Sequence, residues 1–185
     1  MTGAHTVAEP TLRLATPDDI PAITELIALS ARGLCVGAYT AAQVEAALGT
    51  AWGCDSELIR DGTYFVFEAD GRLVACGGWG RRRTLFGGDN QPGRVSELLD
   101  PERDAARIRA FFVHPEWARR GLARALLGLC ESEARTAGFG ATELMATLTG
   151  VGFYERHGYT GSDGVEYPLP GGEVMRFVPM RKALG

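Results

Sequence analysis

The residues best suited to do chemistry lie in one run, Arg107–Leu127, where a strand pattern gives way to a helix pattern. The strand pattern covers Arg107–Val113 and ends at His114-Pro115, and an amphipathic helix is expected from about Gly121. The first N–H groups of a helix have no partner within it, and the helix dipole places positive charge at that end. Gly121 permits close backbone approach, and Ala123 keeps the next turn slim. This helix start is therefore suited to binding a phosphate group.

Three arginines near this helix start, Arg119, Arg120 and Arg124, would add charge-assisted donors for an anion. A glycine that opens a helix also occurs in ordinary strand-to-helix turns with solvated arginines, so the run alone supports either interpretation. The sequence contains neither of the common nucleotide-binding patterns, GxxxxGK[ST] and GxGxxG.

A second segment of the sequence narrows the interpretation of Arg107–Leu127. Gly-Phe-Tyr-Glu-Arg-His-Gly-Tyr occupies 152–159, some thirty residues downstream of the helix start. Together the two segments resemble the GCN5-related N-acetyltransferase (GNAT) superfamily. In that family a "VHP"-like turn, here Val113-His114-Pro115, leads into a Q/R-x-x-G-x-G/A loop, here Ala118–Ala123, and an "FYxxxGF" segment follows. The resemblance also extends to the order of elements over residues 11–182.

The resemblance implies a fold and a cofactor. The fold is a mixed α/β sheet, mostly antiparallel, flanked by helices, whose central strands Arg107–Val113 and Ala141–Thr147 splay apart. The co-substrate is acetyl-CoA, and no metal is implied. Backbone groups of the first of these strands would bind the pantetheine arm, and one N–H would polarise the thioester carbonyl. The implied cofactor-binding residues are Phe111, Phe112, Val113, Arg119, Arg120, Gly121, Leu122, Ala123, Arg124 and Thr149.

The sequence departs from the family pattern at three places. Ala118 stands where the family often has Gln or Arg, so Arg119 or Arg120 would have to supply that contact. Thr149 stands where many members have Asn, although a hydroxyl can still bond to the pantetheine arm. The Arg107–Val113 strand carries no acidic residue where some members keep a glutamate base.

By its place in the second motif, Tyr154 is the expected catalytic acid. The leaving group is a thiolate whose parent thiol has a pKa of about 8.5, whereas a phenol of pKa about 10 stays protonated at neutral pH and can donate. Apart from the family match, Tyr154 would be interpreted as a core aromatic residue at the start of a short helix.

No general base is assigned. Glu68, Glu97 and His114 are the candidates, with ordered water as a relay. His114 has an ordinary pKa near 6.5, but its place in the turn also suits a structural hydrogen bond. Glu97 lies in an irregular segment, where it is as well explained as a solvated residue.

The acceptor site is expected, from the resemblance, to involve Leu34–Thr40, Trp79–Phe86 and the C-terminal strands. Trp79 could flank a substrate or pack against the sheet. Arg81-Arg82-Arg83 could be a solvated edge or could bind a carboxylate on the acceptor. The sequence leaves these alternatives open.

The elements needed to position these groups follow from periodicity and turn residues. A strand at Thr11–Ala15 precedes a helix opened by Asp18 and Asp19, and a capping box predicts a second helix from Thr40. Asp70-Gly71 predicts the turn of a hairpin formed by residues 63–69 and 72–79. A long irregular segment follows over 80–104, with strand continuing to Phe86 and a short helix at Ser96–Leu99. A strand–helix–strand crossover is expected over 107–147, with a Glu131–Arg135 pair on its helix. A short helix at 152–157 and strands at 159–167 and 173–180 follow.

Composition excludes several classes of protein. The chain has 185 residues, 45% apolar and 23% charged, with a net charge of −4, so nucleic acid and anionic membranes are poor partners. We expect a flexible tail at 1–10 and a single domain at 11–185. No segment is apolar enough for a membrane span, and no signal peptide is evident. Four widely spaced cysteines are expected to be buried, reduced thiols in a cytoplasmic protein.

The sequence thus predicts an acetyl-CoA-dependent N-acetyltransferase that acts on a primary amine of a small molecule by direct attack in a ternary complex. Two alternatives remain open: acetylation of a protein or peptide, and a non-catalytic acyl-CoA-binding module. As family members are often dimers, a homodimer is also considered.

Overall fold

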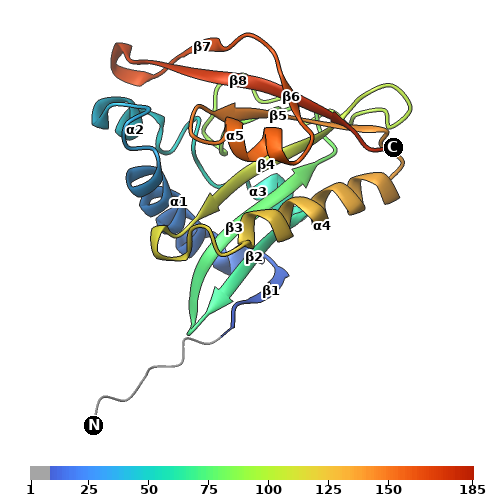
Figure 1. Cartoon of the computed structure of the whole chain (residues 1–185), viewed down its shortest axis with the longest axis horizontal. Helices are drawn as coiled ribbons and strands as arrows, with labels where there is room; N and C mark the ends of the chain where they lie inside the picture. The colour runs from blue at the N-terminus through green and yellow to red at the C-terminus, as the bar shows by residue number, and fades with distance from the viewer. Residues whose placement is uncertain (1–8) are drawn as a thin grey trace.

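The computed structural model describes residues 9–185, which contain an eight-stranded sheet in the order β1-β2-β3-β4-β5-β8-β6, with β7 paired to β8. Every strand pair is antiparallel except β4–β5, which is parallel. The mixed, mostly antiparallel sheet expected from the sequence is therefore confirmed (Figure 1). The strands are β1 Thr11–Leu14, β2 Tyr64–Ala69, β3 Arg72–Gly80, β4 Ala106–Val113, β5 Ala141–Thr147, β6 Thr160–Gly161, β7 Val165–Pro168 and β8 Val174–Ala183.

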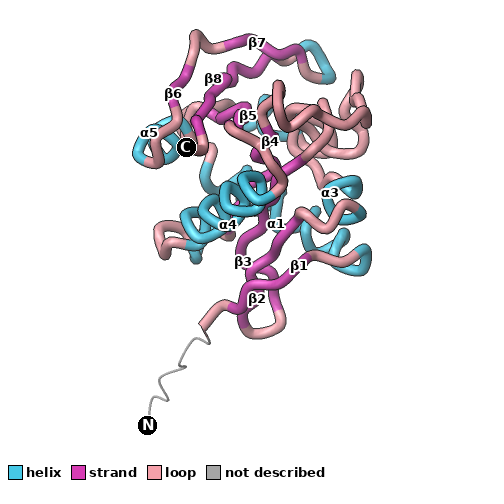
Figure 2. The backbone as a smooth tube through the Cα atoms, turned by 90° about the vertical axis from the view of Figure 1, so that its right-hand side faces the viewer, coloured by secondary structure: helices cyan, strands magenta, loops and turns pink. Residues whose placement is uncertain are grey.

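Helices cover both faces of the sheet. The longest, α1 and α4, lie on opposite faces of β3 and β4 (Figures 1 and 2), and each packs on its own apolar core. The α-helices are α1 Ile20–Leu34, α2 Ala41–Ala47, α3 Ser56–Arg60, α4 Leu122–Thr136 and α5 Val151–Arg156, with 3-10 turns at Pro17–Asp19, Pro115–Trp117 and Pro170–Gly172.

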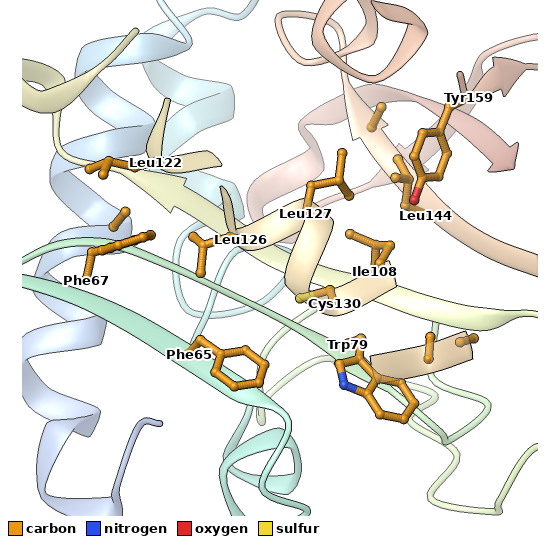
Figure 3. Close-up of a cluster of buried hydrophobic side chains, with 14 of the residues drawn as sticks. Phe65, Phe67, Trp79, Ile108, Leu122, Leu126, Leu127, Cys130, Leu144 and Tyr159 are labelled. Atoms are coloured by element: carbon orange, nitrogen blue, oxygen red, sulfur yellow. The ribbon is translucent and has the colours of Figure 1, made fainter. Parts of the chain in front are cut away.

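The core beneath α4 fixes this helix on the sheet. Leu126, Leu127 and Cys130 of α4 are at most 1% exposed, and in Figure 3 Leu127 and Cys130 lie beside Ile108 of β4. Burying a Leu side chain stabilises a fold by about 1.5–3 kcal/mol relative to leaving it exposed. The packing therefore holds the helix start, and the loop before it, in a fixed position next to β4.

The central strands diverge. β4 and β5 are paired only at Ala106–Thr142 and Arg107–Glu143, where the Arg107 and Glu143 side chains also form an ion pair. Towards Val113 and Thr147 the two strands are no longer bonded to each other. The splayed strand pair expected from the sequence is confirmed.

A β-bulge at Ala110 changes the direction of β4. Ala110 and Phe111 together stand opposite the single residue Gly77 of β3, and Ala110 has φ 54°. The extra residue reverses the alternation of side chains, so that Ile108 and Phe111 both join the core on the α4 side. A bulge bends its strand, which is consistent with the separation of β4 from β5 beyond this point.

The locally determined elements match the sequence predictions. The Asp70-Gly71 turn has φ angles of 50° and 71°, as the tightest hairpin turns require. Thr40 and Gln43 form the predicted capping box of α2. The short helix at 152–157 corresponds to α5, one residue earlier, and the strand Ala141–Thr147 is confirmed.

Four details of the prediction were wrong. Residues 96–99 are not helical, because the chain there pairs with residues 81–84 through backbone hydrogen bonds such as Arg83 N to Glu97 O at 3.0 Å. β3 ends at Gly80 and does not continue to Phe86. The strand over 159–167 is broken between β6 and β7. Glu131 binds Lys182 at 2.7 Å and not Arg135, which instead donates to the Leu184 carbonyl.

Residues 1–8 of the predicted tail lie outside the described residues. Within residues 9–185, no helix is both long and apolar enough to cross a bilayer. All four cysteines are free and buried, as predicted.

Candidate active site

A cavity of about 270 Å³ lies where β4 and β5 diverge. Its walls come from both sides of the sheet. On the α4 side they include Phe111, Ala123, Phe153 and Tyr154, and on the α1 side Leu34, Cys35, Trp52, Phe86, Met145 and Phe177. The gap between the strands therefore links the two faces of the sheet, so that two molecules could meet in it from opposite sides.

The loop that enters α4 offers unpaired backbone donors beside this cavity. Arg119 has φ 64° and Gly121 has φ 86°, so the backbone turns sharply twice before the helix. Among residues 9–185, the N–H groups of residues 119–124 have no hydrogen-bond partner, and the Gly121 N-cap has no side-chain cap. These free donors at the positive end of a 15-residue helix form a site for an anion such as a phosphate.

The side chains around this loop differ in what they can contribute. Arg119, Arg120 and Arg124 are exposed, and Arg120 lies over the Trp117 ring at 4.6 Å. Leu122 is 7% exposed and packs in the core, so only its backbone is available to a ligand.

Tyr154 of α5 is one of the residues that line the cavity. Its ring packs edge to face on Phe153 and Tyr159, at 5.0 and 5.5 Å between centroids. No residue in the range 9–185 forms a hydrogen bond with its hydroxyl group. Burial raises the pKa of Tyr154 above its ordinary value, and the nearby Cys130 raises it further. The phenol therefore stays protonated throughout the neutral range and is free to donate.

The other residues expected to bind the cofactor lie along the same cleft. Phe111, Phe112, Val113 and Thr149 all line the cavity. The Val113 N–H already donates to Ser30 Oγ at 3.1 Å, and Phe111 lies in the bulge opposite Gly77. Thr149 is exposed, with its hydroxyl 3.2 Å from that of Thr147. No sequence motif pointed to Ser30, because its partner is 83 residues away.

Two buried tyrosines brace the strands that border the cleft. Tyr64 donates to the Ala110 carbonyl at 3.1 Å and thereby satisfies an acceptor in the bulge. Tyr39 donates to the Arg176 carbonyl at 2.6 Å and accepts from the Leu148 N–H at 2.9 Å, which joins β8 to the end of β5. Burial raises the pKa of Tyr39 to about 12 and raises that of Tyr64 well above its ordinary value.

Because of these buried phenols and of two buried thiols, we expect the protein to lose stability in alkali. Burial also raises the pKa of Cys54 and of Cys76 to about 12. In the unfolded chain thiols ionise near pH 8.5 and phenols near pH 10, whereas in the folded protein they stay protonated to higher pH. The free energy of unfolding is therefore unaffected by these groups below those values, and it falls as the pH rises towards 12. Burial raises the pKa of Cys35, Cys130, Tyr154 and Tyr159 as well, so these groups act in the same direction. The sequence has a single lysine, Lys182, and arginine does not titrate in this range, so basic groups contribute little. The urea midpoint should fall steadily between pH 8.5 and 11, and a constant midpoint would show that these buried groups do not govern stability in alkali.

A buried ionic network, which no sequence motif indicated, borders the cavity through Arg109 and Gly87. Arg109 of β4 is 3% exposed and donates to Asp55, which is 1% exposed, at 2.7 Å. Arg109 also bonds to the carbonyls of Thr84 and Gly87 at 2.8 and 2.7 Å, and Arg94 binds Asp55 at 2.8 Å. The network thus ties the 81–99 segment to β4 and to the start of α3. Burial lowers the pKa of Arg109, but guanidinium remains charged at any working pH.

None of the three candidate bases lines the cavity in the described part of the chain. Glu68 binds Arg13 at 2.8 Å, and Glu97 binds Arg83 at 3.0 Å. His114 accepts a hydrogen bond from the Glu116 N–H at 3.2 Å through Nδ1, which confirms the structural interpretation of this residue.

The segments expected to form the acceptor site reach the cavity in part. Leu34, Phe86 and Phe177 line it, whereas Trp79 and the three arginines have structural roles. Trp79 is 2% exposed and donates to Glu133 at 2.8 Å, so it packs between sheet and helix and does not flank a substrate. Arg82 and Arg83 are paired with Asp61 and Glu97, and Arg81 lies over the Trp79 ring at 5.4 Å. None of the three arginines lines the cavity, so the interpretation as a carboxylate anchor was wrong.

Comparison with known families agrees with this geometry. The model of the acetyltransferase (GNAT) family matches residues 32–159, which is more than half of the chain. The chain belongs to the GNAT acetyltransferase family. As a member of this family, the protein is an acyltransferase, and its matched segment contains both the loop of residues 119–124 and Tyr154. No curated protein matches the sequence.

Solved structures share the fold at low sequence identity. A GCN5-related N-acetyltransferase from Rhodopseudomonas palustris is 20% identical, with 98% of this chain and 99% of that one covered and a TM-score of 0.69. The PaiA N-acetyltransferase from Thermoplasma acidophilum, in complex with coenzyme A, is 14% identical over 95% and 99%, with a TM-score of 0.65. The putative acetyltransferase YncA from Salmonella typhimurium, with acetyl-CoA, is 20% identical over 96% and 95%, with a TM-score of 0.59.

Proposed function

We propose that this acyltransferase uses acetyl-CoA to acetylate a primary amine of a small molecule, by direct attack in a ternary complex. The observation that carries the proposal is the cavity that passes between β4 and β5. It joins the side of the sheet that holds the loop of residues 119–124 and Tyr154 to the side that faces α1.

The residues present fit coenzyme A. The free N–H groups of residues 119–124 and the exposed arginines suit its pyrophosphate. Ala123 adds only a methyl group to the cavity wall, and Thr149 offers a hydroxyl further along it. Beyond Arg107 the edge of β4 is not paired with β5, so backbone groups between Phe111 and Val113 are left for the pantetheine amides, with the Val113 N–H shared with Ser30 Oγ. The two complexes with acetyl-CoA and coenzyme A among the similar structures support the same choice of cofactor.

The proposed chemistry needs few groups from the protein. Acetyl-CoA supplies a thioester carbonyl that is open to attack by a neutral amine. A backbone N–H of β4 polarises that carbonyl, as in an oxyanion hole. The amine nitrogen bonds to the carbonyl carbon as the carbon–sulfur bond breaks, and the electron pair leaves on sulfur. Tyr154 donates its phenolic proton to the sulfur and is reprotonated from water, while the surplus proton on the amide nitrogen passes to water.

Release of free coenzyme A tests the proposal. Acetyl-CoA is incubated with the protein and a panel of amines, amino-acid derivatives and short peptides, and the thiol is detected with a dye. Amine-dependent release is expected, with small amines turned over in preference to peptides. Acetyl-CoA binding without release for any amine would instead favour a binding module, and turnover confined to peptides would favour protein acetylation.

Gly121 provides a test of the anion-binding loop. Its φ of 86° is strained for any other residue, and no atom lies within 4 Å of the position that a methyl group would take there. Gly121→Ala should therefore destabilise the fold by only about 1–2 kcal/mol, but crowd the phosphate and weaken coenzyme A binding by about tenfold or more, or about 1.4 kcal/mol. Calorimetric titration and thermal unfolding measure the two effects.

Gly128 provides the matched control. It lies in the interior of α4, is exposed, and a methyl group there would also have no neighbour within 4 Å. Since its φ is helical, Gly128→Ala should stabilise the fold by up to about 1 kcal/mol and leave coenzyme A affinity unchanged. Equal affinities for the two variants would remove the phosphate-binding role of the loop.

A further inference from the structure

The chamber on the α1 side of the cavity has aromatic walls. Trp52, Phe86 and Phe177 line it, and Trp52 and Phe177 are 5% and 2% exposed. The rings pack against one another, with Phe177 at 6.5 Å from Trp52 and 5.7 Å from Phe86. Leu34 and Met145 add aliphatic surface. A molecule that enters this chamber exchanges water for apolar contacts on several sides.

The titratable groups of the cavity lining are few. They are Cys35, Arg109 and Tyr154. Burial raises the pKa of Cys35 and of Tyr154, so both are protonated at neutral pH, and Arg109 is permanently charged. Arg109 uses its terminal nitrogens on Asp55, Thr84 and Gly87. The lining therefore contains, among residues 9–185, no side chain that could hold an ammonium ion by charge or take a proton from it.

From this lining we infer that the acceptor is a weakly basic primary amine carried on an aromatic or similarly apolar body. The inference rests on the proposed function and narrows its acceptor. An ammonium ion is costly to place among apolar walls without a partner. The enzyme would thus use the fraction of amine that is already neutral in solution. At pH 7 this fraction is roughly 300 times larger for an α-amino group beside an amide, of pKa about 7.7–8.0, than for an alkylamine, of pKa about 10.4.

A pair of matched amines tests the basicity. Phenylalaninamide and phenethylamine share the aromatic body and differ by a carboxamide next to the amine. At saturating acetyl-CoA and pH 7, kcat/KM should be about 100-fold or more higher for phenylalaninamide. For each amine, kcat/KM should rise with pH and level off at the pKa of that amine. Equal or reversed preference at pH 7, or one rising limb at a pKa common to both amines, would overturn the inference because it would reveal a base in the enzyme. Preferential turnover of spermidine would overturn it as well.

A variant of Phe86 tests whether the enzyme prefers acceptors with an aromatic or apolar side chain. Phe86 is half-buried and also packs on Tyr167, at 5.0 Å between centroids. Phe86→Leu should reduce the preference for phenylalaninamide over glycinamide by about fivefold. Phe139→Leu is the control, since Phe139 packs on Trp79 outside the cavity, and it should leave the preference unchanged. An unchanged preference in Phe86→Leu would overturn the inference that the acceptor carries an apolar group in this chamber. If no amine releases coenzyme A, the proposed function fails; if other amines are preferred, only the inference does.

Discussion

Replacing Tyr154 with phenylalanine should lower kcat by about 10²–10³-fold, in line with the loss of one general acid. The variant keeps the ring that packs on Phe153 and Tyr159 and removes only a hydroxyl that has no partner among residues 9–185. The fold and the affinity for acetyl-CoA should therefore change little, and the loss should appear in kcat. Steady-state kinetics of thiol release, together with calorimetric titration of acetyl-CoA, separate the two effects.

Tyr159 gives a control with the same chemical change. Its hydroxyl is 2.8 Å from that of Thr142, and the residue is 2% exposed in the core. Tyr159→Phe should cost about 1 kcal/mol of stability for the lost hydrogen bond and leave kcat within about twofold, because Tyr159 does not line the cavity. If both variants, or neither, lose activity, Tyr154 is not the acid.

The second large effect is expected at Asp55. Asp55→Asn should destabilise the protein by about 3–5 kcal/mol, because two arginines would lose the buried carboxylate that faces them. Asparagine can still cap α3, where Asp55 accepts from the Glu57 N–H at 3.0 Å, so the change isolates the charge. For a chain of this size, the expected fall in Tm is about 10 °C. The KM for the acceptor should also rise, since the same network holds Gly87 of the cavity wall.

An exposed ion pair serves as the comparison for Asp55. Glu45 binds Arg32 at 2.6 Å, and both side chains are more than half exposed. Glu45→Gln should leave the stability nearly unchanged, because water screens an exposed ion pair. Thermal unfolding of the two variants measures the difference, and a similar, small cost for both would show that the buried network contributes little.

The parts of the fold that could be predicted depend on neighbours in the sequence. The Asp70-Gly71 turn and the Thr40–Gln43 capping box are each determined within four residues, and both are present. The same holds for the start of α4, because Gly121 marks it locally. The sequence could bring Ala123 and Tyr154 into one candidate site because they lie in two short motifs, and both line the cavity.

What could not be predicted depends on long-range contacts. Asp55 and Arg109 are 54 residues apart, and single charged residues give no sign of such a pairing. The bulge at Ala110 requires a left-handed backbone at a residue that does not favour it, so only the surrounding sheet reveals it. Residues 96–99 were misassigned because their backbone partners lie at 81–84. The aromatic chamber likewise combines Trp52, Phe86 and Phe177 from three separate segments.

The central claim is that the cleft between β4 and β5 binds the acetyl donor with its sulfur close to Tyr154. A crystal structure of the protein with coenzyme A tests it most directly. We expect the pyrophosphate within hydrogen-bond distance of backbone N–H groups in residues 119–124, and the thiol in the cavity within reach of the Tyr154 hydroxyl. Coenzyme A bound elsewhere, or a thiol that Tyr154 cannot reach even through one water molecule, would contradict the claim.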